Sequence, residues 1–184
     1  MITHLHFDHV GGLVKSSPSG DTEPVFCNAN HYVQKDHWSW ANEPSLRDRG
    51  SFLPPTFRPI EESGRLVFLE GDVQIMPGLG VMVSNGHTPS MQMPIFRGRF
   101  NGQSETIVFP SDLLPTSAHR GAAWGMAYDL FPLDVIREKQ DLLERAALEG
   151  WILVFEHDPD KEAARVSKVH DRIVLTPCEV PDKI

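Results

Sequence analysis

Cysteine and long apolar runs are both scarce in this sequence, and each shortage bears on where the protein works. The 184 residues include only Cys27 and Cys178, which lie far apart and form no Cys-x-x-Cys pair. This pattern argues against a disulfide framework and favours a reducing compartment. No apolar run is long enough to cross a membrane, and no basic and apolar leader follows Met1. We therefore expect a cytoplasmic protein with neither a transmembrane span nor a signal peptide.

Positive charge is the second shortage. Lys and Arg number 17 against 25 Asp and Glu, which gives a formal net charge of −8, and the pI is about 5.5. Phosphate backbones and acidic membranes are held by clustered Lys and Arg, and the sequence has no such cluster. We therefore expect no nucleic-acid partner and no membrane partner. Hydrophobic residues make up 40% of the chain and charged residues 23%, so residues 1–184 suit a single domain with a core of its own.

Metal-ligating side chains, by contrast, are concentrated at the start of the chain. His4, His6, Asp8 and His9 form the pattern His-x-His-x-Asp-His, and Gly11-Gly12 follows. On an extended segment the first two histidines share a face, and the glycine pair permits a sharp bend before a helix. Imidazoles with a carboxylate suit Zn, Fe, Mn or Ni better than Ca or Mg. The alternative, a strand end with merely solvated histidines, leaves unexplained why every position is a competent ligand.

Two later strand ends carry further candidate ligands. His87 follows a predicted strand over 81–84 and is held by Gly86 before it and Pro89 after it, which fixes its direction as a metal ligand requires. We predict that it joins His4 and His6. Asp112 follows the apolar run 106–109, where a helix or turn cap explains an isolated aspartate equally well.

The motif from His4 to His9 resembles the signature of the metallo-β-lactamase fold superfamily, whose members are mostly dinuclear metal-dependent hydrolases. The resemblance extends to the sequence Gly86–Pro89, although Ser90 and Met91 stand where relatives continue with Gly and often His. Together the matching elements run from His4 to His157 and cover most of the chain.

The resemblance implies a complete ligand set. Asp112 would bridge two metals, although Ser111 stands where relatives typically have Gly, and His157, after the apolar run 151–155, would be the last ligand. The implied cofactors are two divalent ions, Zn²⁺ by default with Mn, Fe or Ni as alternatives. A hydroxide would lie between the metals, and the two ligand sets would be His4, His6 and His87 for one metal, and Asp8, His9 and His157 for the other.

The resemblance also implies the fold class, α/β, as a four-layer αββα sandwich. In relatives this motif follows several strands, whereas only three residues precede His4 here. We therefore expect an N-terminally truncated domain, either a fragment or natural short form, or a chain that forms a homo-oligomer in which another copy completes the sheet.

The remaining pattern predicts the following elements, by residue number: a short helix from 13, strands at 24–27, 65–69, 73–76, 81–84, 93–96, 106–109 and 151–155, helices at 31–40 and from 134 to Gly150, a helical turn at 160–164, and a strand or hairpin over 165–175. His31 and His37 lie on the predicted helix 31–40 without ligand spacing, so we interpret both as surface or packing residues.

Four residues are candidates for a substrate pocket. Residues 41–60 are rich in proline and predict a loop or short-helix insertion. In lactonase-like relatives such an insertion shapes the substrate pocket, so Phe52 and Leu53 would contact substrate or anchor the loop. His119 and Trp124 lie in an irregular segment, 113–133, expected near the site, where apolar residues line a pocket or join the core.

The predicted function is a dinuclear metallohydrolase. Two cations that share one water lower its pKa from ~15.7 towards neutrality, and Asp8 or Asp112 would pass a proton to the leaving group. The segments 111–116, 127–130 and 155–158 look like the lactonase and organophosphate-hydrolase side of the superfamily, and the apolar residues suit a small ester or lactone. Four alternatives stay open: a thioesterase, an organophosphate hydrolase, a β-lactamase, or a remnant that binds metal without useful turnover. The superfamily also includes RNA-processing nucleases, but the acidic surface argues against that activity.

Overall fold

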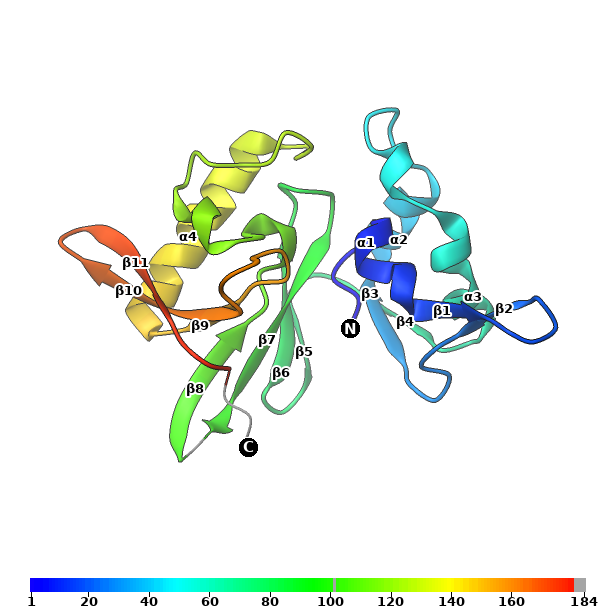
Figure 1. The fold of residues 1–184 in the computed structure, drawn as a ribbon, viewed down its shortest axis with the longest axis horizontal. Coiled ribbons are helices and arrows are strands. Elements are labelled where there is room, and N and C mark those ends of the chain that lie inside the picture. Colours follow the sequence, from blue (N-terminus) through cyan, green and yellow to red (C-terminus); the bar gives the residue numbers. More distant parts are fainter. Residues whose placement is uncertain (101, 181–184) are drawn as a thin grey trace.

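The central element of the fold is a mixed β-sheet. The computed structural model describes residues 1–100 and 102–180, and within them seven strands form one sheet in the order β11-β10-β9-β8-β7-β6-β5 (Figure 1). The bounds of the strands are β5 Val73–Met76, β6 Leu79–Ser84, β7 Met91–Phe100, β8 Gln103–Val108, β9 Ile152–Val154, β10 Ala163–Val169 and β11 Arg172–Pro177. The strands predicted at 73–76, 81–84, 93–96, 106–109 and 151–155 are confirmed, as is the terminal hairpin.

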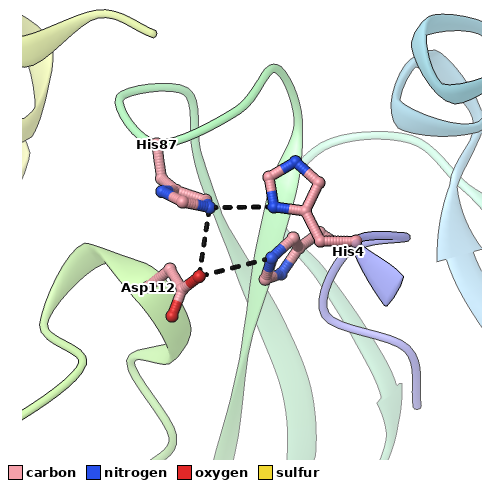
Figure 2. Close-up of side chains that lie close together, drawn as sticks. His4, His87 and Asp112 are labelled. Atoms are coloured by element: carbon pink, nitrogen blue, oxygen red, sulfur yellow. Dashed lines mark hydrogen bonds and ion pairs between the residues drawn. The ribbon is translucent and has the colours of Figure 1, made fainter. Parts of the chain in front are cut away.

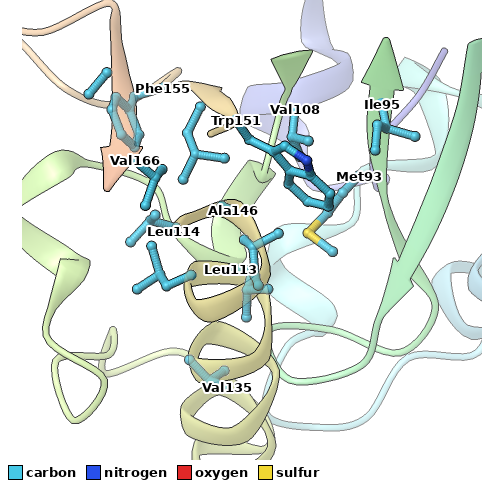
Figure 3. Packing of buried hydrophobic residues seen from close by; sticks show 14 of the residues in the cluster. Met93, Ile95, Val108, Leu113, Leu114, Val135, Ala146, Trp151, Phe155 and Val166 are labelled. Atoms are coloured by element: carbon cyan, nitrogen blue, oxygen red, sulfur yellow. The ribbon is translucent and has the colours of Figure 1, made fainter. Parts of the chain in front are cut away.

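One long helix covers one face of this sheet. Helix α4, Pro132–Glu149, starts with proline at its first turn and ends at Gly150, whose φ of 70° is the left-handed conformation that favours glycine. Its apolar side packs on Trp151 and on alternate residues of the strands, including Met93 of β7 (Figure 3). The predicted helix is therefore confirmed, with its start two residues earlier than expected.

The first seventy residues form a smaller unit on the opposite face. Successive strand residues point to opposite faces, so Gln92 of β7 points away from the face that carries Met93. Its side-chain amide donates to the carbonyl oxygens of Ile2, at 2.7 Å, and Tyr32, at 3.0 Å. These bonds hold the N-terminal segment against the sheet, so that α4 and the N-terminal unit lie on opposite faces (Figure 1).

The N-terminal unit has its own apolar cluster, built around Leu5, Val10, Val33 and Phe57, all fully buried. In the described residues it contains two short strand pairs, β1 with β2 and β3 with β4, the second pair parallel. Its elements are α1 Phe7–Val10, β1 Val14–Ser16, β2 Thr22–Pro24, β3 His31–Gln34, α2 Lys35–Asn42, α3 Arg58–Glu62 and β4 Leu66–Leu69. The strand predicted at 65–69 is β4.

Several predictions for short elements are wrong. Helix α1 precedes the glycine pair rather than following it, and the segment after Leu13 is strand β1. Residues 25–27 form exposed turns beyond β2 instead of a buried strand. Residues 31–34 form strand β3, because its pairing with β4 buries His31 and Val33, and the helix begins only at Lys35. Apolar runs this short have no period that separates strand from helix, so tertiary pairing decides.

Residues 160–162 and 41–60 are two further segments whose structure can be compared with the prediction. Residues 160–162 form bends rather than the predicted helical turn, and strand β10 begins at Ala163. Residues 41–60 contain the short 3-10 helices Arg49–Ser51 and Pro54–Thr56 and the start of α3. The designation of this segment as an insertion and of the chain as one domain stay predictions. Among the described residues, no helix combines the length and the apolarity that crossing a membrane requires.

Candidate metal centre

The candidate ligands meet at one edge of the large sheet because three strands end there. Strands β6 and β8 are both antiparallel to β7, and β8 is parallel to β9, so β6, β8 and β9 run in the same direction. His87, Asp112 and His157 each follow the end of one of these strands. Parallel alignment therefore brings together residues that are up to seventy positions apart in the sequence.

The N-terminal segment brings the other histidines to the same edge. The backbone N–H of Gln92 donates to the carbonyl oxygen of Thr3 at 2.9 Å, next to the bond from its side chain to Ile2. Beyond this anchor, His4 and His6 precede the short helix α1, which carries Asp8 and His9. The chain is extended enough to pair His6 with Phe52 in an isolated bridge, although residues 4–6 form no regular strand.

A first cluster, His4, His6, His87 and Asp112, is entirely buried, and one potential ligand atom from each residue lies within 4.8 Å of the others. Asp112 Oδ2 lies 3.1 Å from His87 Nε2 and 3.5 Å from His4 Nε2 (Figure 2). The ring nitrogens His87 Nε2 and His6 Nδ1 are 3.2 Å apart. These four residues are the three predicted ligands of one metal and the predicted bridging carboxylate.

A second cluster, His9, Asp112, Glu156 and His157, meets the same distance criterion. Asp112 Oδ2 lies 3.3 Å from His9 Nε2, and its other oxygen, Oδ1, lies 3.3 Å from His157 Nε2. Asp112 thus faces both clusters, one oxygen towards the first and one towards His157. Asp8, which is 44% exposed, lies beside the second cluster, with Oδ2 3.5 Å from His9 Nε2 and 3.8 Å from His157 Nε2.

Burial and the shared carboxylate determine the protonation of the site. Burial lowers the pKa of His4 well below its usual value and lowers that of His6 to about 3, so both rings are neutral and present lone pairs. Burial also lowers the pKa of His87, but hydrogen bonds to Asp112 and Asp129 outweigh it and raise the pKa to about 9. Burial raises the pKa of Asp112, yet hydrogen bonds from His4, His87 and His9 shift it far below the usual range.

The donor set fits divalent transition metals. His4 Nε2 and His6 Nε2 are buried and have no hydrogen-bond partner among the described residues. Neutral imidazoles that converge on a carboxylate are the ligands these metals prefer, and a buried polar atom without a partner is costly unless something satisfies it. A cation in the first cluster would satisfy both of these atoms.

Two residues that support the ligands were not found from the sequence. Asp129 is buried and its Oδ1 accepts a hydrogen bond from His87 Nδ1 at 2.9 Å, which directs His87 Nε2 into the site. His37 donates from Nδ1 to the carbonyl oxygen of Pro89 at 2.7 Å and accepts from the Leu5 N–H at 2.8 Å. His37 is thus a buried packing residue that joins the His4-His6 segment to the turn after His87.

Ser111 and Glu156 also shape the site. Ser111 has a φ of 49°, the left-handed conformation that favours glycine, which gives a physical reason for glycine before the bridging carboxylate in relatives. Its hydroxyl lies 3.4 Å from His4 Nδ1. Burial raises the pKa of Glu156 to about 9, aided by the neighbouring charge of Asp112. Only the position of Glu156 before His157 could have drawn attention to it in the sequence.

The four predicted pocket residues have different surroundings in the structure. Phe52 is buried with its ring 4.8 Å from that of His6, and Leu53 beside it is exposed. His119 hydrogen-bonds to the Thr116 hydroxyl at 2.8 Å, and Trp124 is 65% exposed, its carbonyl oxygen held by the buried Lys139. Of these four, only Phe52 is seen in contact with a candidate ligand, His6, and a pocket role for all four stays a prediction.

Comparison with known proteins identifies the family. Residues 1–157 match the model of the metallo-beta-lactamase superfamily, so the chain belongs to that superfamily, as the resemblance implied. The fold class, α/β of the metallo-β-lactamase type, is confirmed by solved structures. A probable metal-dependent hydrolase from Staphylococcus aureus is 28% identical, with a TM-score of 0.81 over 97% of this chain and 61% of its own.

Two other similar proteins match this chain at lower sequence identity or over a shorter stretch. A dizinc quorum-quenching lactonase shares the fold at 18% identity, with a TM-score of 0.76 over 97% of this chain and 63% of its own. A 3',5'-cyclic-nucleotide phosphodiesterase from Aliivibrio fischeri is 35% identical over 51 residues, 27% of this chain and 16% of its own. This chain thus spans less than two thirds of the length of each of these relatives.

Proposed function

We propose that this chain carries the dinuclear metal centre of a hydrolase that acts on a lactone or a related ester. The observation that supports the proposal most strongly is the position of Asp112, whose two oxygens face two ligand clusters at once. His4, His6 and His87 would hold one metal, and Asp8, His9 and His157 the other, with Asp112 shared. Divalent cations held there supply Lewis acidity, which lowers the pKa of water towards neutrality and polarises a substrate carbonyl.

Asp8 is better placed than Asp112 to move a proton. Asp112 lies 3.1–3.5 Å from ring nitrogens of four histidines, and these contacts favour its charged form throughout. Asp8 is 44% exposed and lies at the solvent side of His9 and His157. A carboxylate at this edge can accept a proton from water and deliver it to a leaving alkoxide. We therefore assign proton transfer to Asp8 and metal bridging to Asp112.

The surroundings of the ligands support an uncharged, partly apolar substrate. Phe7 is 50% exposed and lies in the sequence between the candidate ligands His6 and Asp8, and the exposed ring of Tyr128 lies 6.0 Å from that of His87. Leu53 is exposed next to Phe52, the residue that contacts His6. Exposed apolar side chains around a polar centre are typical of small-molecule sites. An acyl chain of a lactone or ester would contact these side chains. Another structure that shares the fold, an N-acyl homoserine lactone hydrolase, holds the product N-hexanoyl-L-homoserine at its catalytic metal centre.

A second candidate reaction is the hydrolysis of a phosphodiester. The local match to a cyclic-nucleotide phosphodiesterase favours it. The net charge of −8 argues against a strongly anionic substrate. Both reactions would require metal, so only the identity of the substrate that is hydrolysed distinguishes them.

The test is a panel of three substrates on protein reconstituted with Zn²⁺ or Mn²⁺: an acyl lactone, an aryl ester and an aryl phosphodiester. We expect metal-dependent turnover of the lactone and ester, abolished by a chelator and by His87→Ala. Turnover of the phosphodiester alone would favour the second candidate. Bound metal without turnover of any substrate would favour the remnant. Solution mass, measured on the same sample, checks whether a homo-oligomer forms.

A further inference from the structure

Arg47 joins two segments of the chain that lie on either side of the first metal site. Its Nη2 donates to the carbonyl oxygen of Ala127 at 2.7 Å, although the two residues are 80 positions apart. The first segment, residues 45–53, belongs to the N-terminal unit, and the second, residues 121–131, lies between strand β8 and helix α4. Both lie at the same end of the molecule (Figure 1). The ligand assignment uses neither Arg47 nor Ala127, so the contact needs a reason of its own.

The first segment connects Arg47 to the metal ligand His6. Directly after Arg47, the buried carboxylate of Asp48 accepts a hydrogen bond from Trp40 Nε1 of helix α2 at 2.7 Å. At its other end the segment reaches Phe52, which pairs with His6 in the isolated bridge. Hydrogen bonds to a charged group are among the stronger ones, so the backbone that carries Arg47 is held in a fixed position relative to His6.

The second segment is tied to the ligand His87 and to helix α4. Asp129 Oδ1 accepts from His87 Nδ1 at 2.9 Å, and the Leu130 N–H donates to the His87 carbonyl oxygen at 3.1 Å. Nearer its start, the carbonyl oxygen of Trp124 accepts a hydrogen bond from the buried Lys139 of α4. Lysine is almost never buried without a partner, so this bond anchors the base of the segment.

These links form a closed circuit around the first metal site. At its base, His6 Nδ1 and His87 Nε2 lie 3.2 Å apart. From His6 the circuit follows the first segment to Arg47, crosses to Ala127 and returns through the second segment to His87. Both residues of the crossing are exposed, whereas the two histidines at the base are buried. The Arg47 contact therefore closes the circuit on its solvent side, from which a substrate approaches the metals.

We propose that Arg47 is a specificity-determining residue, because its bond to Ala127 fixes the spacing between Leu53 and Tyr128. The inference rests on the proposed function, which places an acyl chain against these two side chains. Leu53 ends the first segment, and Tyr128 directly follows Ala127 with its ring 6.0 Å from that of His87. Without the bond the two segments separate at their exposed ends, and a bulkier acyl group fits between them.

The experiment compares the unmodified chain with Arg47→Met, which keeps an unbranched stem and removes the donors. In the metal-free proteins, amide hydrogen exchange followed by mass spectrometry reports local opening, and we expect faster exchange in both segments of Arg47→Met. After reconstitution with Zn²⁺, kcat/KM is measured for an acetyl and a benzoyl aryl ester. The ratio of benzoyl to acetyl should rise roughly tenfold in Arg47→Met, while kcat for the acetyl ester stays unchanged because the metal ligands keep their positions.

Two further variants separate the bond from the charge. Arg49→Met is the matched control, since Arg49 is also exposed and lies two residues further along the same segment. It removes the same charge and should leave both the exchange and the ester ratio as in the unmodified chain. Arg47→Lys keeps a charged donor on a more compact head group, and its ester ratio should fall between those of the unmodified chain and Arg47→Met.

Unchanged exchange in Arg47→Met, or faster exchange with an unchanged ester ratio, would overturn the inference. An equal effect of Arg49→Met would also overturn it, because charge rather than the bond would then be responsible. If the unmodified chain hydrolyses esters but the ratio does not respond to Arg47, the inference fails and the proposed function stands. If the metal-loaded, unmodified chain hydrolyses no ester or lactone, the proposed function fails and takes the substrate role of Arg47 with it.

Discussion

The hydrogen bond from His87 to Asp129 makes a quantitative prediction for the variant Asp129→Asn. Asp129 receives two donors, His87 Nδ1 through Oδ1 at 2.9 Å and the Met126 N–H through Oδ2 at 2.8 Å. An asparagine has one oxygen and one NH₂ group, so either orientation sets a donor against a donor in a buried position. One unsatisfied donor costs about 1–3 kcal/mol.

This cost should appear in metal affinity, because the lost contact aims His87 Nε2. Removal of a carboxylate that orients a metal-binding histidine typically costs 10- to 100-fold, which is roughly 1.4–2.7 kcal/mol. The assay is a chelator competition titration of the metal-free protein, with Asp141→Asn, the same change on the exposed side of α4, as control. If Asp129→Asn binds both equivalents as tightly as the unmodified chain, Asp129 does not position His87 and the reasoning is refuted.

Two further predictions concern residues behind the ligands. Burial lowers the pKa of His37 to about 4, so the unfolded chain takes up this proton first as the pH falls below 6.5. In the metal-free protein, His37 should therefore contribute a loss of up to ~1.4 kcal/mol of stability per pH unit as the pH falls from 6.5 to 4. Measured by urea unfolding at several pH values, the stability of His37→Gln should depend less steeply on pH than that of the unmodified chain; the same dependence in both would contradict this. In Gly86→Ala the new Cβ would lie 2.5 Å from the Val135 nitrogen, so thermal unfolding should report a loss of about 1–3 kcal/mol, whereas Gly50→Ala, with no atom within 4 Å, should be nearly neutral.

Most residues of the two clusters could be found from the sequence because they belong to short local patterns. His4, His6, Asp8 and His9 occur within six residues, and His87 is flanked by Gly86 and Pro89. Strand ends present side chains in defined directions, so the sequence indicated where each ligand would point. The long helix α4 was equally predictable, since its apolar period runs over many turns and a glycine ends it.

The supporting groups could not be predicted, because their partners are remote in sequence. Asp129 is 42 residues from His87, and His37 is 32 from Leu5. The same limit explains the errors at β3, where pairing with β4, more than thirty residues later, turns an apparent helix start into a strand. In each case the deciding contact is tertiary.

The central claim is that Asp112 is shared by two metal sites, and metal stoichiometry tests it most directly. Native mass spectrometry under metal-replete conditions should show two metals per unmodified chain. Asp112→Asn should weaken both equivalents, whereas His157→Ala should weaken only one. A chain that binds no metal, or an Asp112→Asn variant that loses only one equivalent, would contradict the shared-carboxylate centre.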